Sequence, residues 1–190
     1  MSGTVATVGA RRPNMLGIGM VVWLASELMF FAGLFAAWFG VRAVNDVWPP
    51  EGVHLDVPRT AVATAVLVAS SFTLHAGERA AHHGDRTRAV RWVLLTAALG
   101  SAFLANQAVE WAELDFSVSS HAYGTLFYVL TGFHGLHVLG GVVLMLAVLG
   151  VGTGRGTKAP LHESLTVTAY YWHFVDVVWV AMFATIYLLG

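Results

Sequence analysis

Apolar residues fill five long stretches of the chain, and charged or turn-forming residues bound each stretch. A membrane-spanning helix needs about 20 mainly apolar residues, whereas a strand of a membrane β-barrel alternates apolar and polar positions over about 10 residues. Because the five stretches are continuously apolar, the pattern predicts helices and no barrel. We expect spans at about residues 15–41, 60–77, 92–109, 123–151 and 166–189.

The predicted fold is therefore all-α, a polytopic integral membrane bundle of five transmembrane helices. Residues 1–13 form an N-terminal tail, and residues 14–190 form a single membrane domain. The segments between the predicted spans are short, and the sequence shows no internal repeat. No segment is long enough for a second domain.

Lysine and arginine fall mostly on one side of the predicted membrane. The tail, the loop after the second span and the loop after the fourth span carry Arg11, Arg12, Arg79, Arg86, Arg88, Arg91, Arg155 and Lys158. The other side has only Arg42 and Arg59. Because basic residues accumulate in cytoplasmic loops, we expect the N-terminus in the cytoplasm and the C-terminus outside.

Composition agrees with a membrane protein and excludes several classes of function. Of the 190 residues, 57% are hydrophobic and 11% are charged, whereas a soluble domain has about 25% charged residues. The net charge of −1 argues against a nucleic-acid partner, which requires a basic face. The absence of cysteine excludes disulfides, iron–sulfur clusters and thiol catalysis.

Glu27 lies in the middle of the first predicted span. A charged residue at the centre of a spanning helix costs about 2.5–3.5 kcal/mol on insertion scales, so this carboxyl should face protein or water. One hypothesis is a carboxyl that handles protons or contacts a ligand. The other is a buried acid hydrogen-bonded to a neighbouring helix, and this residue by itself leaves both open.

Three polar pairs share a spacing of three residues, which places both members on one face of a helix. They are Gln107 with Glu110, His134 with His137, and His173 with Asp176. Histidines and a carboxylate are common metal ligands, so one hypothesis is a haem or metal site. The alternative is a network of hydrogen bonds between helices, in which each contact stabilises helix association by about 0.6 kcal/mol.

Several motifs resemble subunit III of the haem-copper oxidases, the family of cytochrome c oxidase subunit III. They occur in the family's order from about Asn14 to the end of the chain, which is similar to short five-span forms of actinobacterial aa3-type oxidases. Many members have seven spans, and this chain starts at what resembles their third. The motifs are Ser26-Glu-Leu-Met-Phe-Phe31, Trp48-Pro-Pro50 followed by His54, Gln107 with Glu110, Thr131-Gly-Phe-His-Gly-Leu-His-Val138 and Tyr171-Trp-His-Phe-Val-Asp-Val-Val-Trp179.

The resemblance changes the expected role of the polar residues. Members of this family contact subunit I, enclose a phospholipid cleft and bind neither haem nor copper, so the resemblance implies no catalytic residue and no metal site here. The residues expected at the lipid cleft or in support of proton uptake are Glu27, Glu110, His134, His137, His173 and Asp176. Those expected to contact lipid headgroups are Arg155, Lys158 and His162.

The function that the resemblance implies is a non-redox subunit of a proton-pumping aa3-type cytochrome c oxidase in a bacterial cell membrane. Haem a, haem a3 and copper are expected in partner subunits, and the expected partners are subunits I and II, phospholipid and a cytochrome bc complex. A quinol oxidase or a nitric oxide reductase with a similar subunit is the alternative. A transporter using Glu27 and Asp176 is disfavoured, because the sequence lacks inverted repeats and broken helices.

Overall fold

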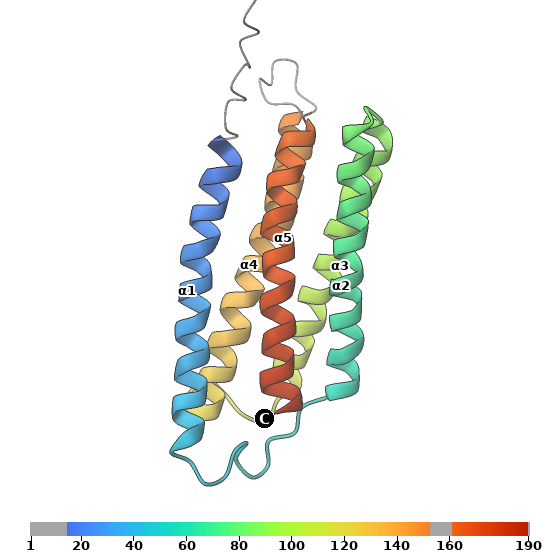
Figure 1. Cartoon of the computed structure of the whole chain (residues 1–190). Coiled ribbons are helices and arrows are strands. Elements are labelled where there is room, and N and C mark those ends of the chain that lie inside the picture. Colours follow the sequence, from blue (N-terminus) through green and yellow to red (C-terminus); the bar gives the residue numbers. More distant parts are fainter. Residues whose placement is uncertain (1–14, 153–160, 190) are drawn as a thin grey trace, which may run out of the picture.

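The computed structural model describes residues 15–152 and 161–189, and these fold into long helices (Figure 1). Each of the five is long and apolar enough to cross a membrane, and the described residues contain no strand. This confirms the predicted all-α, five-span fold. The elements are α1 (Met15–Ala43), α2 (Val57–His82), α3 (Arg86–Glu113), α4 (Ala122–Gly152), α5 (Leu161–Phe183) and a π-helical turn, η1 (Ala184–Leu188).

Helices α2 and α3 are longer than the apolar stretches that predicted them, residues 60–77 and 92–109. Both continue through polar residues at each end, and an aspartate cap fixes where each one begins. The carboxylate of Asp56 accepts the backbone N–H of Arg59 at 3.0 Å, and that of Asp85 accepts the N–H of Arg88 at 3.0 Å. Gly84, with a φ of +76°, makes the tight turn between the two helices.

Helix α5 lies at the centre of the bundle and contacts α1, α2 and α4, while α3 contacts α2 and α4. Figure 1 shows α1 and α2 at opposite edges, with α5 between them. The loop over residues 44–56 therefore carries the chain across the end of the bundle. We call the end where α1 and α5 begin and α2 finishes the N-side end, and the other the far end.

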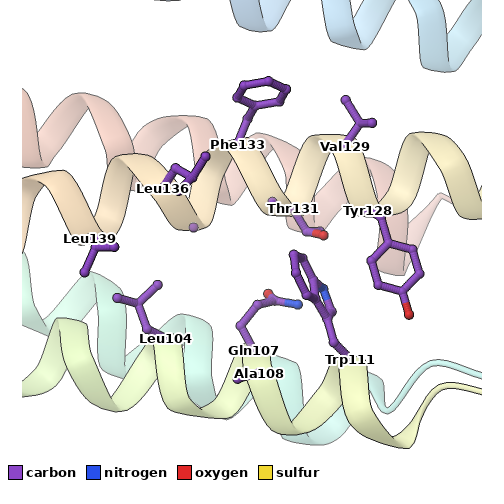
Figure 2. Close-up of a pocket in the computed structure, with 12 residues that line it drawn as sticks. Leu104, Gln107, Ala108, Trp111, Tyr128, Val129, Thr131, Phe133, Leu136 and Leu139 are labelled. Carbon is purple, nitrogen blue, oxygen red and sulfur yellow. The ribbon is translucent and has the colours of Figure 1, made fainter. Parts of the chain in front are cut away.

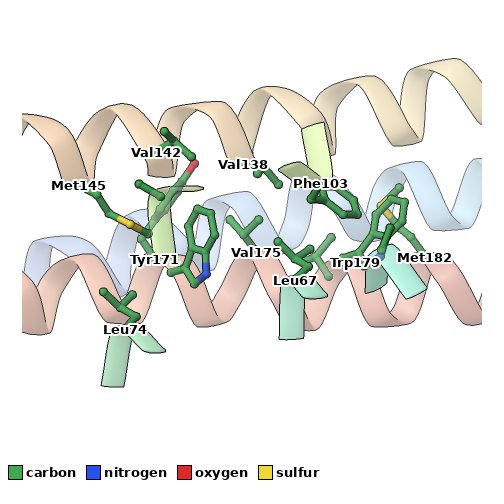
Figure 3. Close-up of a cluster of buried hydrophobic side chains, with 14 of the residues drawn as sticks. Leu67, Leu74, Phe103, Val138, Val142, Met145, Tyr171, Val175, Trp179 and Met182 are labelled. Atoms are coloured by element: carbon green, nitrogen blue, oxygen red, sulfur yellow. The ribbon is translucent and has the colours of Figure 1, made fainter. Parts of the chain in front are cut away.

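The core surrounds the buried face of α5, as Figure 3 shows. Leu67 and Leu74 of α2, Phe103 of α3 and Met145 of α4 all have 1% or less of their surface exposed, and Phe103 packs edge-on against Trp179 of α5. A protein interior at this density leaves little room for added volume. By contrast, the described helix α1 buries only Phe31 and Trp38 and exposes most of its apolar surface.

Candidate functional site: polar contacts within the spans

Glu27 and His137 contact each other inside the bundle, between α1 and α4. The carboxylate Oε2 lies 3.0 Å from the imidazole Nε2, and the two side chains are 20% and 15% exposed. The other ring nitrogen, Nδ1, lies 2.7 Å from the carbonyl oxygen of Phe133. A carbonyl only accepts, so Nδ1 carries a hydrogen. The Glu27–His137 bond consequently holds one proton, as either imidazolium with carboxylate or imidazole with carboxylic acid.

Aromatic side chains enclose this pair and connect it to α5. The hydroxyl of Tyr171 donates to the backbone carbonyl of His137 at 2.7 Å. Trp23 stacks on Tyr171 with ring centroids 5.3 Å apart, and Phe31 meets the imidazole edge-on at 5.0 Å. The pair is therefore satisfied within the protein, which explains how the first span tolerates its carboxyl.

His134 lies apart from His137, although both belong to α4. Its ring stacks on Trp179 at 4.8 Å and meets Phe103 edge-on at 5.8 Å, with 1% of the residue exposed. Neither ring nitrogen has a hydrogen-bond partner among the described residues. Although the two histidines are three residues apart, they face different neighbours. His134 packs in the core against α3 and α5, whereas His137 contacts α1.

His173 and Asp176 of α5 meet through Ser71 of α2. The serine Oγ lies 2.7 Å from Nδ1 of His173 and donates a short hydrogen bond to Oδ2 of Asp176. Asp176 is 6% exposed, and its second oxygen has no partner in the described part of the chain. These two predicted residues are therefore brought together, but away from Glu27.

Glu110 belongs to a separate network near the far end. Its carboxylate accepts the hydroxyls of Thr60 at 3.1 Å and Tyr187 at 2.9 Å, and the amide of Gln107 at 3.3 Å. Arg59 pairs with Glu113 beside it. With three donors, this carboxylate ties together α2, α3 and η1.

The predicted headgroup residues lie only partly within the described residues. His162 begins α5 and places its ring 5.1 Å from that of His82. Arg155 and Lys158 lie outside the described ranges. The basic role expected for this loop therefore stays a prediction.

An apolar groove opens between α3 and α4 (Figure 2). Its volume is about 640 Å³, and its lining includes Leu104, Trp111, Phe133 and Leu136. None of the six residues predicted for the lipid cleft is among its lining residues. An apolar groove suits an acyl chain better than a polar molecule.

Sequence reasoning missed a further polar row, in which Glu78 of α2 accepts the hydroxyl of Thr166 at 2.7 Å. Its signal in the sequence is the spacing of Ser71, His75, Glu78 and His82, which repeats every three or four residues. In the described ranges, no three His, Cys, Asp or Glu side chains are grouped to hold a metal ion. The groups that these sites contain are carboxyls, imidazoles and hydroxyls, which donate and accept hydrogen bonds between helices.

The fold and these contacts define a polytopic membrane protein with protonatable side chains between its helices. The family profile of cytochrome c oxidase subunit III matches residues 7–190. The chain belongs to this family, as the sequence motifs predicted. It is accordingly part of an oxidoreductase complex, and other oxidase subunits are its partners.

Similar proteins match over nearly their whole length. A protein of Nocardia farcinica named probable cytochrome c oxidase subunit 3 is 48% identical over 183 residues, covering 94% of this chain and 90% of the relative. A Mycobacterium tuberculosis protein of the same name is 45% identical over 196 residues, covering 99% and 96%. Cytochrome c oxidase subunit 3 of Thermostichus vulcanus is 36% identical over 198 residues, covering 100% and 98%.

Proposed function

We propose that this chain is the non-redox subunit III of a proton-pumping, aa3-type cytochrome c oxidase in a bacterial cell membrane. Haem a, haem a3 and copper in partner subunits would carry electrons from cytochrome c to oxygen. This chain would stabilise subunit I and its uptake of protons. The observation that carries the proposed proton role is the Glu27–His137 pair, which holds one transferable proton between spans.

The surface of α1 supports the proposed contact with subunit I or phospholipid. This helix exposes large apolar side chains along its length, among them Leu16, Val22 and Met29. Inside a membrane such a face suits either acyl chains or another helix, because neither requires hydrogen bonds from it. The groove between α3 and α4 is a second place that suits an acyl chain.

The proposed orientation puts the N-side end in the cytoplasm. Arg79, Arg86, Arg88 and Arg91 lie at that end, whereas Arg42 and Arg59 lie at the far end. Basic residues near the ends of spans are retained on the cytoplasmic side, and they also attract anionic headgroups there.

The first experiment is to tag the chain, purify it gently from its native membrane and identify the subunits that accompany it. We expect subunits I and II, a reduced-minus-oxidised spectrum of haem a, and oxidation of cytochrome c. A complex that oxidises quinol or reduces nitric oxide would replace the proposal with one of its alternatives. Haem bound to this chain after separation would contradict its non-redox role.

A further inference from the structure

Two rows of polar residues face each other along α2 and α5. Within each row the members recur at intervals of three, four or seven residues, which keeps them on one face of a helix with 3.6 residues per turn. The row on α2 is Ser71, His75, Glu78 and His82, and the row on α5 is His162, Thr166, His173 and Asp176. We call these eight residues the α2–α5 seam.

Contacts connect the two rows from the N-side end to the middle of the membrane. The rings of His82 and His162 lie 5.1 Å apart, and Glu78 accepts the hydroxyl of Thr166 at 2.7 Å. His75 and His82 both flank the Glu78 carboxylate, at 3.6 and 3.9 Å. From His162 to Asp176 the helix rises roughly 21 Å, about two thirds of a hydrocarbon core of about 30 Å.

The seam is open at one end and closed at the other. The side chains of His75 and His82 are 57% and 51% exposed, whereas Asp176 is almost completely buried. Beyond Asp176 the fully buried Leu67 interrupts the polar row, and Trp179 donates its N–H to Thr64 at 2.9 Å. The polar path thus ends at a carboxyl whose second oxygen has no partner among the described residues.

The inner hydrogen bonds have a defined direction. Ser71 has one hydroxyl hydrogen and donates it to Asp176, so its oxygen accepts from Nδ1 of His173. His75 and Glu78 lie four and seven residues from Ser71 on the same face of α2, toward the N-side end. No direct hydrogen bond between Glu78 and His173 occurs in the described structure, so that step needs a bridging water.

We propose that the α2–α5 seam is a proton-binding half-channel that loads Asp176 from the aqueous phase at the N-side end. A proton from water passes through His82, at the outer end of the seam, to the Glu78 carboxylate and through water to Nε2 of His173. Nδ1 of His173 then gives its hydrogen to Ser71, whose hydroxyl hydrogen moves to Oδ2 of Asp176. One proton enters and Asp176 gains it, while each relay group keeps its number of protons. The hydrogen of His173 has then moved from Nδ1 to Nε2, so the ring must exchange tautomers before the next transfer.

Ionisable side chains distinguish this seam from an ordinary polar contact between helices. Hydroxyl and amide side chains suffice to join membrane helices, and they cost far less to bury than histidine and carboxylate do. Trp172, which donates to Ser70 at 2.8 Å, illustrates such a neutral contact between the same two helices. Six of the eight seam residues are histidine or carboxylate, which suits proton transfer, in which donors and acceptors must lie within hydrogen-bond reach or one water apart.

Titratable groups on the other elements around α5 have partners or surroundings of their own. Glu27 of α1 and His137 of α4 bond to each other, and His134 of α4 lies against Trp179. Glu110 of α3 accepts from Thr60 and Tyr187. Charged groups at the open end include Arg79, Asp85, Arg86, Arg88 and Glu163, and Arg86 lines a small cavity together with His162.

The test is infrared spectroscopy of the intact oxidase complex moved from H2O to D2O, at a pH where Asp176 carries a proton. The difference between the wild type and Asp176→Asn isolates the carboxyl signal of this residue. We expect Glu78→Gln, which keeps an acceptor for Thr166, to slow deuteration of Asp176 by about a hundredfold, the lower end of what a positioned proton-transfer group contributes. Ser71→Ala should slow it similarly.

A matched pair of neighbouring histidines provides the control. His82→Gln removes a seam residue and should slow deuteration, whereas His83→Gln, outside the seam, should leave the rate unchanged. Equal rates in the wild type, Glu78→Gln and Ser71→Ala would overturn the proposal. So would a carboxyl that never takes up a proton over the pH range in which the complex stays assembled.

The inference rests on the proposed function, and proton uptake by reconstituted vesicles separates the two. If omission of the whole subunit leaves uptake during turnover unchanged, the proposed function fails. If omission impairs uptake but Glu78→Gln, Ser71→Ala and His82→Gln all match the wild type in both measurements, only the seam fails.

Discussion

Individual carboxyls in this protein are stable within the membrane because each has a specific set of partners. Glu27 shares one proton with His137, and Glu110 accepts three hydrogen bonds from hydroxyl and amide groups. Asp176 accepts from Ser71. The three carboxyls therefore differ in their surroundings: Glu27 shares a proton with an imidazole, Glu110 joins α2, α3 and η1, and Asp176 lies at the inner end of the proposed seam.

At Glu27 a substitution can remove the transferable proton and still keep the hydrogen bond to His137. Glu27→Gln keeps a donor for Nε2 of His137 but loses the exchangeable proton, so we expect normal assembly and haem spectra with proton pumping that declines over sustained turnover. Glu27→Ala leaves Nε2 without a partner and should weaken retention of the subunit by about 0.6–1.7 kcal/mol. Pumping per electron in vesicles and thermal release of the subunit measure these effects. Loss of haem incorporation in Glu27→Gln would contradict this role.

Helices α3, α4 and α5 approach closely where glycine faces an aromatic ring. Cβ atoms added at Gly100 and Gly141 would both lie 2.6 Å from the indole of Trp172, whereas one at Gly135 would lie 3.8 Å from Leu104. Glycine is therefore required at the first two positions, because a larger side chain would not fit.

The π-helical turn at the end of α5 is another local feature, and it directs Tyr187 to Glu110.

Two alanine substitutions on α4 test this requirement. Gly141→Ala must displace the indole of Trp172 or the helix backbone, so we expect a loss of about 1–3 kcal/mol in stability, as for other overpacked cores. Gly135→Ala adds the same methyl group at ordinary contact distance and should be neutral or slightly stabilising. Thermal dissociation of the purified complex compares the two. Equal dissociation temperatures would show that the bundle adjusts around Trp172 at no cost.

At the scale of the whole molecule, the bundle consists of a well-buried group, α2 to α5, and a peripheral helix, α1. In the most apolar stretch of each span, 56% of the residues are buried in the span formed by α5 and η1, compared with 6% in α1. Helix α1 joins the others through Phe31, Trp38 and the Glu27–His137 bond. Most of its remaining surface is apolar and exposed, which agrees with a chain that belongs to a larger complex.

This difference predicts how the chain opens when its partners are removed. Amides of α1 should exchange with deuterium faster than those of α5 once the subunit is separated from the complex, because few buried contacts resist local opening. Within the complex the difference should narrow. Hydrogen–deuterium exchange with mass spectrometry measures both states. Equal protection of α1 and α5 in the separated chain would mean that α1 is held more firmly than its burial indicates.

The five spans could be predicted from sequence because a membrane core admits only long apolar helices, so hydropathy by itself identifies them. The family could also be predicted, because several of its motifs occur in the family's order along almost the whole chain. The ends of α2 and α3 could not be predicted as well, because both helices continue through charged residues that hydropathy excludes, and capping aspartates fix where they begin.

The partners of the polar residues were decided only by the tertiary structure. Spacing correctly places His134 and His137 on nearby positions of α4, but which neighbour each one faces depends on how α1, α3 and α5 surround that helix. Likewise, Ser71 connects His173 to Asp176 because two helices distant in sequence lie antiparallel in one register. Periodicity describes a single helix, whereas a site between helices depends on side-chain volumes and close approach, for which a single sequence contains no direct signal.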